Sequence, residues 1–447
     1  MTRFPPSLSS QVRRLSTAIC LAATLLLVQP LPGHAREVEF GPGLRSIDFD
    51  KVFDRSNATR AKMWDDLYAA GLRGVVLSQG MVSPRAPDHS SRPDGTYLAG
   101  PALKQVRETM NRGPGTADDF HVTYVAGYGL GGTGCGPGDD PATLGREAAD
   151  WEYETALKRL LDAGIPIRRI DVDGPFLRLI TNSRKAFSCA VGQARSGYSG
   201  RQTATAVHAY MKRLRDRVDA HKTTTASGLS VEMGLLFNLP NWALGGRPAL
   251  KSAGATGDLI EDVLLPFGRI MAEDRDRRPL SLASTVIDYP YPYVLADPAA
   301  FKAKTAALLD ALRDLPDTAP TLTFITNTDY GLAGSGNDPR QAGYEGTVPC
   351  VWRDNWKISG GSLPYLPYEN AAGQTMPADC VAQQNDADSR YREESVKFAE
   401  MLDSGAWRGR SVAASDIAAY RFTSWHEMPV SSISMMNRVL RFMTYGE

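Results

Sequence analysis

The sequence predicts an α/β protein folded as a (β/α)8 TIM barrel. Short β-rich runs alternate with longer amphipathic stretches, the alternation recurs eight times, and the links after the strands are much longer than those after the helices. The chain has 447 residues, 43% of them hydrophobic and 22% charged, which is enough apolar material for one large core. A doubly wound open sheet is the structural alternative, but no Gly-x-Gly-x-x-Gly follows the first strand.

The first 35 residues are expected to form a cleavable signal peptide. The Arg13–Arg14 pair supplies a positive segment, 18–28 is apolar, and Ala35 closes a small-x-Ala cleavage site. This apolar run is well short of the ~20 residues that a spanning helix needs, which favours a cleaved signal peptide over the alternative of an uncleaved anchor. We therefore expect a periplasmic or secreted protein whose single catalytic domain is 36–447, without a membrane span in the mature chain.

The charge balance gives no reason to expect a nucleic-acid partner. Lys+Arg and Asp+Glu both number 50 in the full chain. Cleavage after Ala35 would remove three arginines and no acids, so 47 basic side chains would face 50 acidic ones at a formal charge of −3. A chain this close to neutrality has no net field that attracts phosphate backbones or anionic membranes. We expect a monomer.

Cysteine usage predicts two disulfides. One of the five cysteines lies in the expected signal peptide, which leaves Cys135, Cys189, Cys350 and Cys380 for an oxidising compartment. The preferred pairing is Cys350–Cys380, because both lie in one long loop insertion at about 327–388, with Cys135–Cys189 joining two neighbouring loops. The two other connectivities stay open. A zinc site is not expected, since no Cys-x-x-Cys or His pair accompanies these residues.

The predicted strands are short runs with period-two alternation or continuous β-branched and aromatic composition. The run 169–173 (RIDVD) places two aspartates on one face directly before a Gly-Pro breaker. Such a position brings carboxylates to the exit of a buried strand. The expected strands are 44–49, 74–78, 121–126, 169–173, 229–237, 281–288, 321–326 and 418–424.

The predicted helices lie between these strands. Segment 58–70 shows apolar residues at the 3.6-residue spacing and is followed by Gly71, which is typical of a helix end. The expected helices are 58–70, 101–111, 146–163, 203–222, 258–273, 299–315, 389–405 and 435–444.

The loop lengths indicate which end of the barrel carries function. Helix-to-strand links such as 71–74 are short. In a barrel all strand-to-helix loops emerge at the carboxyl ends of the strands, and long loops are unusual unless they are functional. The long links after strands are 79–100, 127–145, 174–201, 237–257 and 327–388.

Acidic, amide and aromatic residues follow several of the predicted strands. Asp173 is the first candidate for a catalytic carboxylate, with Glu232 or Asp288 as its partner and Glu427 in reserve. Asp329 is a second reserve. The further candidates for binding substrate or tuning those carboxylates are Asp171, Asn238, Trp242, Tyr289, Tyr291, Asn327, Asp329, Trp425 and His426.

This mixture of residues suits a sugar. Two carboxyl groups that flank a glycosidic bond supply acid and base, or acid and nucleophile, and aromatic faces stack on sugar rings. With this arrangement the chain resembles the secreted (β/α)8 glycoside hydrolases over its whole mature length, at the level of architecture and without an assigned family. The Asp171-Val-Asp173 pair matches part of the chitinase-like pattern, but Pro175 stands where that pattern has its catalytic Glu. The resemblance implies a polysaccharide or oligosaccharide substrate, and we expect no metal and no cofactor.

Structural roles remain open for each candidate. Asp171 could pair with Arg169, Asp173 could stabilise the turn that follows it, and Glu232 could pair with an arginine. His426 could be a structural histidine, and the aromatic residues around Tyr289 could belong to a packed loop. The aromatic residues of the loop insertion could form a small core around a disulfide.

Two other functions compete with glycoside hydrolysis. The first is a carbohydrate-binding barrel without chemistry, acting in the handling of surface polysaccharide. The second is a metal-dependent hydrolase that uses Asp171, Asp173 and Asp288 as oxygen ligands.

Overall fold

The computed structural model divides the chain into two units, Met1–Ala35 and Arg36–Glu447, and all residues that it describes belong to the second. Within these residues, no helix combines the length and the apolar character that crossing a bilayer requires. The described residues are 36–44, 46, 48–83, 97–111, 120–132, 140–180, 198–222, 230–250, 257–318, 321–328, 378–409, 411–425 and 428–446.

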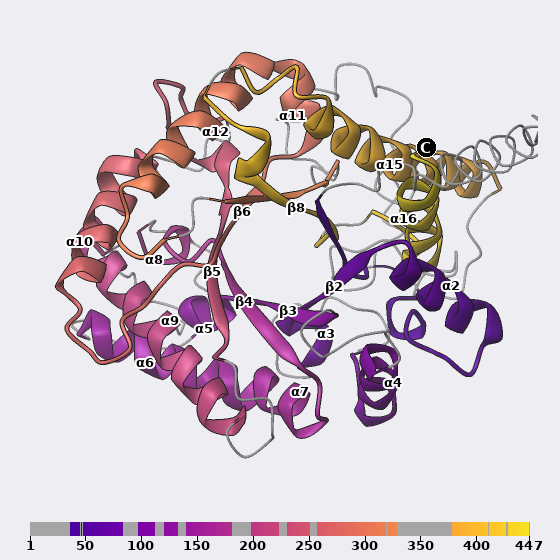
Figure 1. The fold of residues 1–447 in the computed structure, drawn as a ribbon, viewed down its shortest axis with the longest axis horizontal. Helices are drawn as coiled ribbons and strands as arrows, with labels where there is room; N and C mark the ends of the chain where they lie inside the picture. Colours follow the sequence, from indigo (N-terminus) through magenta and orange to yellow (C-terminus); the bar gives the residue numbers. More distant parts are fainter. Residues whose placement is uncertain are drawn as a thin grey trace, which may run out of the picture. The chain divides into compact units, whose positions relative to one another are not determined.

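Eight parallel strands close into one barrel in sequential order, with β1 pairing both β2 and β8. The helices surround this barrel (Figure 1). The predicted TIM barrel is therefore confirmed. The strands are β1 (Glu37–Phe40), β2 (Leu72–Ser78), β3 (His121–Ala126), β4 (Ile167–Asp173), β5 (Glu232–Asn238), β6 (Ser284–Asp288), β7 (Leu322–Ile325) and β8 (Ile417–Phe422).

Each predicted helix has a counterpart, and several begin earlier than expected. The expected helix 146–163 corresponds to α6, η3 and α7, and 389–405 corresponds to the second part of α15. The helices are α2 (Ala58–Ala69), α3 (Gln79–Val82), α4 (Gly100–Asn111), α5 (Tyr128–Gly132), α6 (Pro141–Glu152), η3 (Tyr153–Leu157), α7 (Lys158–Asp162), α8 (Leu177–Ile180), α9 (Gly200–Lys222), η4 (Leu239–Asn241), η5 (Ile260–Leu264), α10 (Leu265–Glu273), α11 (Tyr291–Ala296), α12 (Pro298–Arg313), α15 (Ala378–Ser404) and α16 (Ser432–Tyr445), with the 3-10 turns η1 (Phe49–Lys51) and η6 (Ala414–Asp416).

The first predicted strand is wrong. Strand β1 is Glu37–Phe40, whereas the described part of 44–49 is turn and 3-10 helix. The physical reason is visible at Asp48, whose carboxylate accepts hydrogen bonds from the Ser431 hydroxyl (2.6 Å) and the Ser432 amide (2.7 Å). Asp48 thus caps the start of α16 instead of lying in a sheet.

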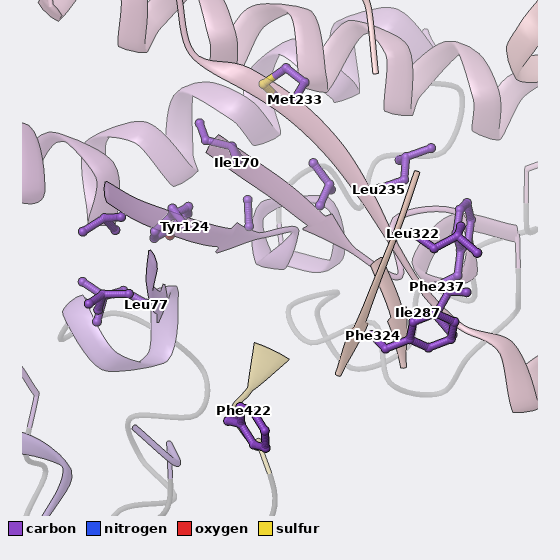
Figure 2. Packing of buried hydrophobic residues seen from close by; sticks show 14 of the residues in the cluster. Leu77, Tyr124, Ile170, Met233, Leu235, Phe237, Ile287, Leu322, Phe324 and Phe422 are labelled. Atoms are coloured by element: carbon purple, nitrogen blue, oxygen red, sulfur yellow. The ribbon is translucent and has the colours of Figure 1, made fainter. Parts of the chain in front are cut away.

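Side chains that point outward from the strands form the main core, between the sheet and the helices. Figure 2 shows Tyr124, Ile170 and Leu235 among them, and each is essentially unexposed. The alternate side chains point into the barrel. Five of these form a separate apolar group, which we call the lumen cluster: Val76, Val125, Leu236, Val286 and Ile325.

Four charged side chains inside the barrel form a second group, the interior network of Glu39, Arg169, Asp171 and Arg421. Arg421 donates from Nε to Glu39 Oε2 (2.7 Å) and from Nη2 to Asp171 Oδ2 (2.6 Å). Arg169 donates to Glu39 as well and lies 3.3 Å from Asp171 Oδ2. Burial alone would raise the pKa of Glu39, but the two guanidinium groups hold it well below its usual value.

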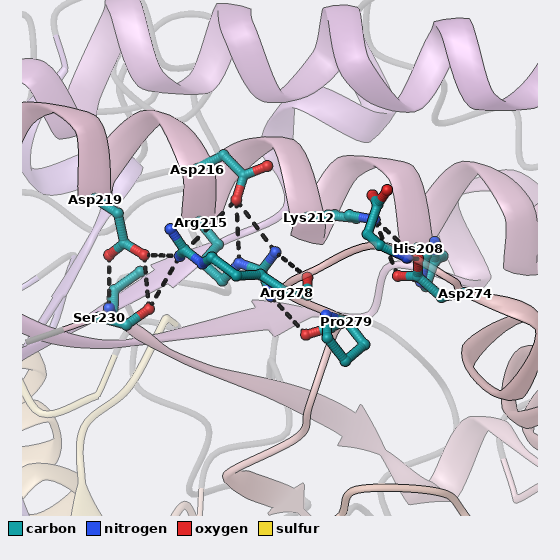
Figure 3. Close-up of polar contacts among 11 residues, drawn as sticks. His208, Lys212, Arg215, Asp216, Asp219, Ser230, Asp274, Arg278 and Pro279 are labelled. Carbon is teal, nitrogen blue, oxygen red and sulfur yellow. Dashed lines mark hydrogen bonds and ion pairs between the residues drawn. The ribbon is translucent and has the colours of Figure 1, made fainter.

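A polar network outside the barrel fixes the chain before β6 against α9 (Figure 3). Arg215 donates to the carbonyl oxygens of Arg278 and Pro279, each at 2.8 Å. Asp219 accepts from the Val231 amide at 2.8 Å, which ties the start of β5 to the same helix. These contacts support the barrel at the amino ends of its strands, away from the predicted functional end.

Candidate active site

Five predicted residues lie at the carboxyl ends of neighbouring strands, and we call them the rim residues. Because parallel strands of a barrel all end on one face, their last residues share one rim. Asp173, Asn238 and Asp288 are the last residues of β4, β5 and β6. Asn327 follows β7 by two positions, and Trp425 follows β8 by three.

Asp288 and Asn238 form a direct pair on this rim. They are register partners on adjacent strands, and Asn238 Nδ2 donates to Asp288 Oδ2 at 2.9 Å. Asp288 is 9% exposed. The remaining oxygen of each side chain, Oδ1, is buried and has no hydrogen-bond partner among the residues described. An unsatisfied buried polar group costs about 1–3 kcal/mol, so this pair is suited to a ligand or water that donates hydrogen bonds.

Asp173 lies on the other side of β5 and is partly exposed. Its side chain takes part in an ion pair with Arg178 (Nη2 to Oδ2, 3.3 Å), and Arg178 Nε donates to its carbonyl oxygen at 3.2 Å. Gly174 follows with φ +50°, a conformation that glycine adopts readily, and donates its amide to Leu236. The nearby guanidinium stabilises the ionised carboxylate. Asp173 therefore lies directly before the turn, and its charged side chain is at the rim.

Asp173 and Asp288 belong to alternate strands. Neighbouring strands lie about 4.8 Å apart, so the backbones of β4 and β6 are roughly 10 Å apart. Side chains that extend toward one another from this spacing can reach the carboxyl separations of glycoside hydrolases, ~5–5.5 Å for retention and ~6.5–9.5 Å for inversion.

Trp425 lies over the inside of the barrel. Its side chain packs against the lumen cluster, to which it contributes a partly buried apolar surface. Its indole Nε1 is buried and makes no hydrogen bond to any part of the chain that the structure describes. Trp425 therefore offers a flat aromatic face and an N–H donor without a partner in the described residues, at the lumen cluster.

Glu232 does not belong to the rim. It is the first residue of β5, so it lies at the amino end of the barrel, opposite Asn238. It pairs there with Arg168 at 3.4 Å, and both side chains are substantially exposed. The strand begins at 232 and not at 229, and this boundary places Glu232 at the wrong end. We do not retain it as a catalytic candidate.

Asp171 belongs to the interior network. The predicted ion pair with Arg169 is present at 3.3 Å, and Ser284 Oγ donates to Oδ1 at 2.7 Å. Both carboxylate oxygens are engaged and the residue is fully buried. This geometry supports the structural role and not substrate binding.

Of three predicted aromatic residues around β6, two are buried in the core and Tyr291 packs against it partly buried. Tyr289 is fully buried and its ring meets Phe301 edge-on at 5.0 Å, while burial raises the pKa of its hydroxyl. Trp242 is also buried, and Tyr291 stacks on Phe398 at 5.1 Å. Successive residues of a strand face opposite sides, so Tyr289 points away from the lumen that Asp288 faces. Burial gives Tyr289 and Trp242 structural roles, whereas sugar stacking by the partly buried Tyr291 stays a prediction.

Several predicted residues lie outside the described part of the chain. Cys380 is in α15, but its side chain is not described. The predicted disulfides and the reserve carboxylates therefore stay predictions. The residues concerned are Cys135, Cys189, Asp329, Cys350, His426 and Glu427.

One supporting residue was missed by the sequence analysis. Glu152 is fully buried behind β3 and accepts hydrogen bonds from the hydroxyls of Tyr124 (2.9 Å) and Tyr210 (3.0 Å) and from the Gly129 amide (2.8 Å). Burial raises the pKa of its carboxyl group. These contacts hold the turn that follows β3 beside Asp173. An acid inside the otherwise apolar stripe of a predicted helix is the signal that could have identified it.

The sequence matches no protein-family model and no curated protein. Among solved structures, it is similar to a β-glucosidase from Thermotoga maritima in complex with cyclophellitol, at 12% identity over 88% of each chain with a TM-score of 0.31. It is also similar to a family 1 β-glucosidase from Thermotoga maritima, at 13% identity over 83% of this chain and 78% of that one, with a TM-score of 0.27. At these values the likeness assigns no family and transfers no catalytic residue.

Proposed function

We propose that this chain is a glycoside hydrolase that cleaves a polysaccharide or oligosaccharide in the periplasm or outside the cell, with Asp173 and Asp288 as its two carboxyl groups. The observation that carries the proposal is the Asn238–Asp288 pair, whose two unsatisfied buried oxygens lie at the ends of β5 and β6, the two strands that follow the strand of Asp173 around the barrel. A sugar hydroxyl would donate to the Asn238 oxygen, and Asp288 Oδ1 would accept from a hydroxyl when ionised or donate to the glycosidic oxygen when protonated.

The two carboxyl groups have different surroundings, which favours different roles. Arg178 stabilises the ionised form of Asp173, as a general base or nucleophile requires. The Asn238 amide donates to Oδ2 of Asp288, so a proton on this group would reside on Oδ1. A proton held there is positioned for transfer to the oxygen of the leaving group, and Asp288 is therefore our candidate for the general acid.

The neighbouring groups suit a sugar ring. The indole face of Trp425 provides an apolar surface for C–H groups, and its unpaired Nε1 provides one donor for a hydroxyl oxygen. Buried donors and acceptors without partners strongly favour a ligand that carries the complementary hydrogen-bonding groups.

The test is a panel of polysaccharides and oligosaccharides assayed for new reducing ends. Asp173→Asn and Asp288→Asn are each expected to lower turnover by about 10²–10⁴-fold, since each removes one acid–base group. Glu232→Gln is the matched control, because it changes an exposed carboxylate at the opposite end of the same barrel. Turnover in both aspartate variants at the wild-type rate would contradict the proposal.

The same variants separate the competing functions. A carbohydrate-binding barrel would bind oligosaccharide, measured by calorimetry, without producing reducing ends in any variant. A metal-dependent hydrolase would lose activity on chelation. Its proposed ligand set is weakened by Asp171, whose oxygens already accept from Arg421 and Ser284.

A further inference from the structure

A group of three ligand-type side chains lies at the amino end of the barrel, opposite the rim residues. Glu37 and Glu39 come from β1, and His121 is the first residue of β3. One ligand atom of each lies within 4.8 Å of the others. Glu39 and His121 are buried, while the Glu37 side chain is 31% exposed. The group therefore sits inside the barrel wall with one side toward solvent.

The histidine at this position lacks a conventional partner. Its side chain is 2% exposed, and neither ring nitrogen makes a hydrogen bond within the described parts of the chain. Nε2 points at two carboxylate oxygens, Glu37 Oε1 at 3.5 Å and Glu39 Oε1 at 3.8 Å. Glu37 Oε1 is itself buried and unsatisfied among the residues described.

These separations suit a shared cation better than direct hydrogen bonds. Hydrogen bonds of this type have donor–acceptor distances of roughly 2.7–3.2 Å. In a tetrahedral zinc site, with metal–ligand bonds of about 2.0–2.1 Å, neighbouring ligand atoms lie roughly 3.3–3.5 Å apart. The distance from His121 to Glu37 falls at that value, and the distance to Glu39 needs only a small side-chain adjustment.

Strand β2 lets the ligand side chains of β1 and β3 approach one another. It lies between β1 and β3, and its inward position at this level is Gly74, the register partner of both Glu39 and His121. A Cβ atom on Gly74 would lie 3.2 Å from Glu39 Oε1 and 3.2 Å from His121 Nε2. A larger residue at this position would push Glu39 and His121 apart, and glycine therefore permits the convergence of the ligands.

The charges nearby also favour a cation. Three carboxylates, those of Glu37, Glu39 and Asp171, face the two guanidinium groups of Arg169 and Arg421, which leaves one negative charge when His121 is neutral. Glu39 Oε1 already accepts from Arg169 and from the Thr123 hydroxyl at 2.9 Å. The hydroxyl can rotate, so its hydrogen can give way to a metal bond.

We propose that Glu37, Glu39 and His121 form a binding site for one divalent transition-metal ion, with Zn²⁺ as the preferred ion. Imidazole nitrogen and carboxylate oxygen are both zinc ligands, and the solvent-facing side next to Glu37 leaves a fourth position for water. The ion would link β1 to β3 across Gly74 and so stabilise the first part of the barrel. This proposal does not depend on the proposed hydrolase activity.

The test uses the full chain, freed of metal with a chelator and titrated with Zn²⁺ alone in a calorimeter. We expect one ion per chain and a rise in melting temperature. Glu37→Gln and His121→Asn are each expected to weaken binding by about tenfold or more, since each removes a ligand. Glu37→Gln changes a partly exposed residue and keeps the experiment informative if the histidine variant folds poorly. Glu232→Gln, at the same end of the barrel, is the control and should bind like the wild type.

Two results would overturn the proposal. The first is an absence of zinc uptake by the wild-type chain, which would mean that His121 faces its carboxylates without an ion. The second is uptake that Glu37→Gln leaves unchanged, which would place the ion elsewhere, for example beside His208 and Asp274, 3.3 Å apart on the outside of the barrel.

Discussion

The barrel interior and the rim both contain buried aspartates, but the hydrogen-bond partners of these aspartates differ. In the interior network, Asp171 accepts from Arg421 and Ser284 with both of its oxygens. At the rim, Asp288 accepts from Asn238 with one oxygen, and its other oxygen is buried without a partner in the described residues. Asp288 ends β6, whereas Asp171 lies two residues before the end of β4, and the two side chains have different neighbours.

This difference distinguishes polar groups with a structural role from polar groups that are available to a ligand. A buried charge is tolerated when a countercharge and hydrogen bonds satisfy it, and the interior network meets both conditions. A buried acceptor without a hydrogen-bond donor lowers the stability of the folded state, and no contact within the protein offsets this loss. A ligand that donates a hydrogen bond would satisfy such an acceptor, and this is the reason for proposing that substrate binds at Asp288 and not at Asp171.

The largest expected effect comes from breaking the interior network. Arg421→Met would leave Glu39 and Asp171 buried without one of their countercharges. We expect the free energy of unfolding to fall by roughly 3–5 kcal/mol, measured by urea denaturation at neutral pH. The rim counterpart is Arg178→Met, which removes a partly exposed ion pair and should cost about 1 kcal/mol or less. Equal losses of unfolding free energy in the two variants would mean that the interior ion pairs contribute no more to stability than the ion pair at the rim.

A smaller loss is expected behind the rim. Glu152→Gln would turn an amide N–H₂ toward a site where every neighbouring group donates, among them the Tyr124 hydroxyl and the Gly129 amide. We expect a loss of about 1–3 kcal/mol in unfolding free energy. Since Gly127 packs closely on the backbone of Asp173, turnover should also fall. Glu152→Gln with wild-type stability and turnover would show that this carboxylate does not support the rim.

The sequence predicted the barrel and the rim for a physical reason. Seven of its strands are periodic or continuously apolar runs, and the last inward residue of such a run must lie at the carboxyl end. Asp173, Asn238 and Asp288 were found in this way. The short strand β1, with only four residues, gave too weak a pattern.

The remaining errors have local and long-range causes. Tyr289 was misplaced although period two would have turned it away from Asp288, and Glu232 was misplaced by a boundary error of three residues. The pairing of Asp171 with Arg421 joins residues 250 positions apart, and only closure of the barrel brings them together. No local pattern contains that contact.

Lys304 is a buried, hydrogen-bonded amine near the rim, and it should make the stability of the protein depend on pH. It is buried and donates to the carbonyl oxygens of Trp242 (2.7 Å) and Pro248 (2.8 Å), in the segment after Asn238. Burial lowers the pKa of its amine from 10.5 to about 8. The unfolded chain therefore binds more protons than the folded chain between these two values, and stability should rise with pH over that window, by at most about 1.4 kcal/mol per pH unit.

The measurement compares wild type with Lys304→Met by urea denaturation from pH 7 to pH 10. Titrations of other groups cancel in the difference between the two proteins. The wild type should gain stability relative to the variant as pH rises above about 8. A difference that stays constant across this range would mean that Lys304 keeps an ordinary pKa.

The smallest expected effect concerns the exposed pair at the amino end. Arg168 and Glu232 lie 3.4 Å apart with 45% and 37% of their side chains exposed. Water screens such a pair, and its median contribution is about 0–1 kcal/mol. Arg168→Ala should therefore change the free energy of unfolding by no more than about 1 kcal/mol, with that change reduced further in high salt. Arg168 and Arg169 are adjacent in sequence, and Arg169→Ala is the matched comparison. If Arg168→Ala lost as much stability as Arg169→Ala, the exposure of an ion pair would not determine its contribution, because the charge and the strand are the same for both arginines.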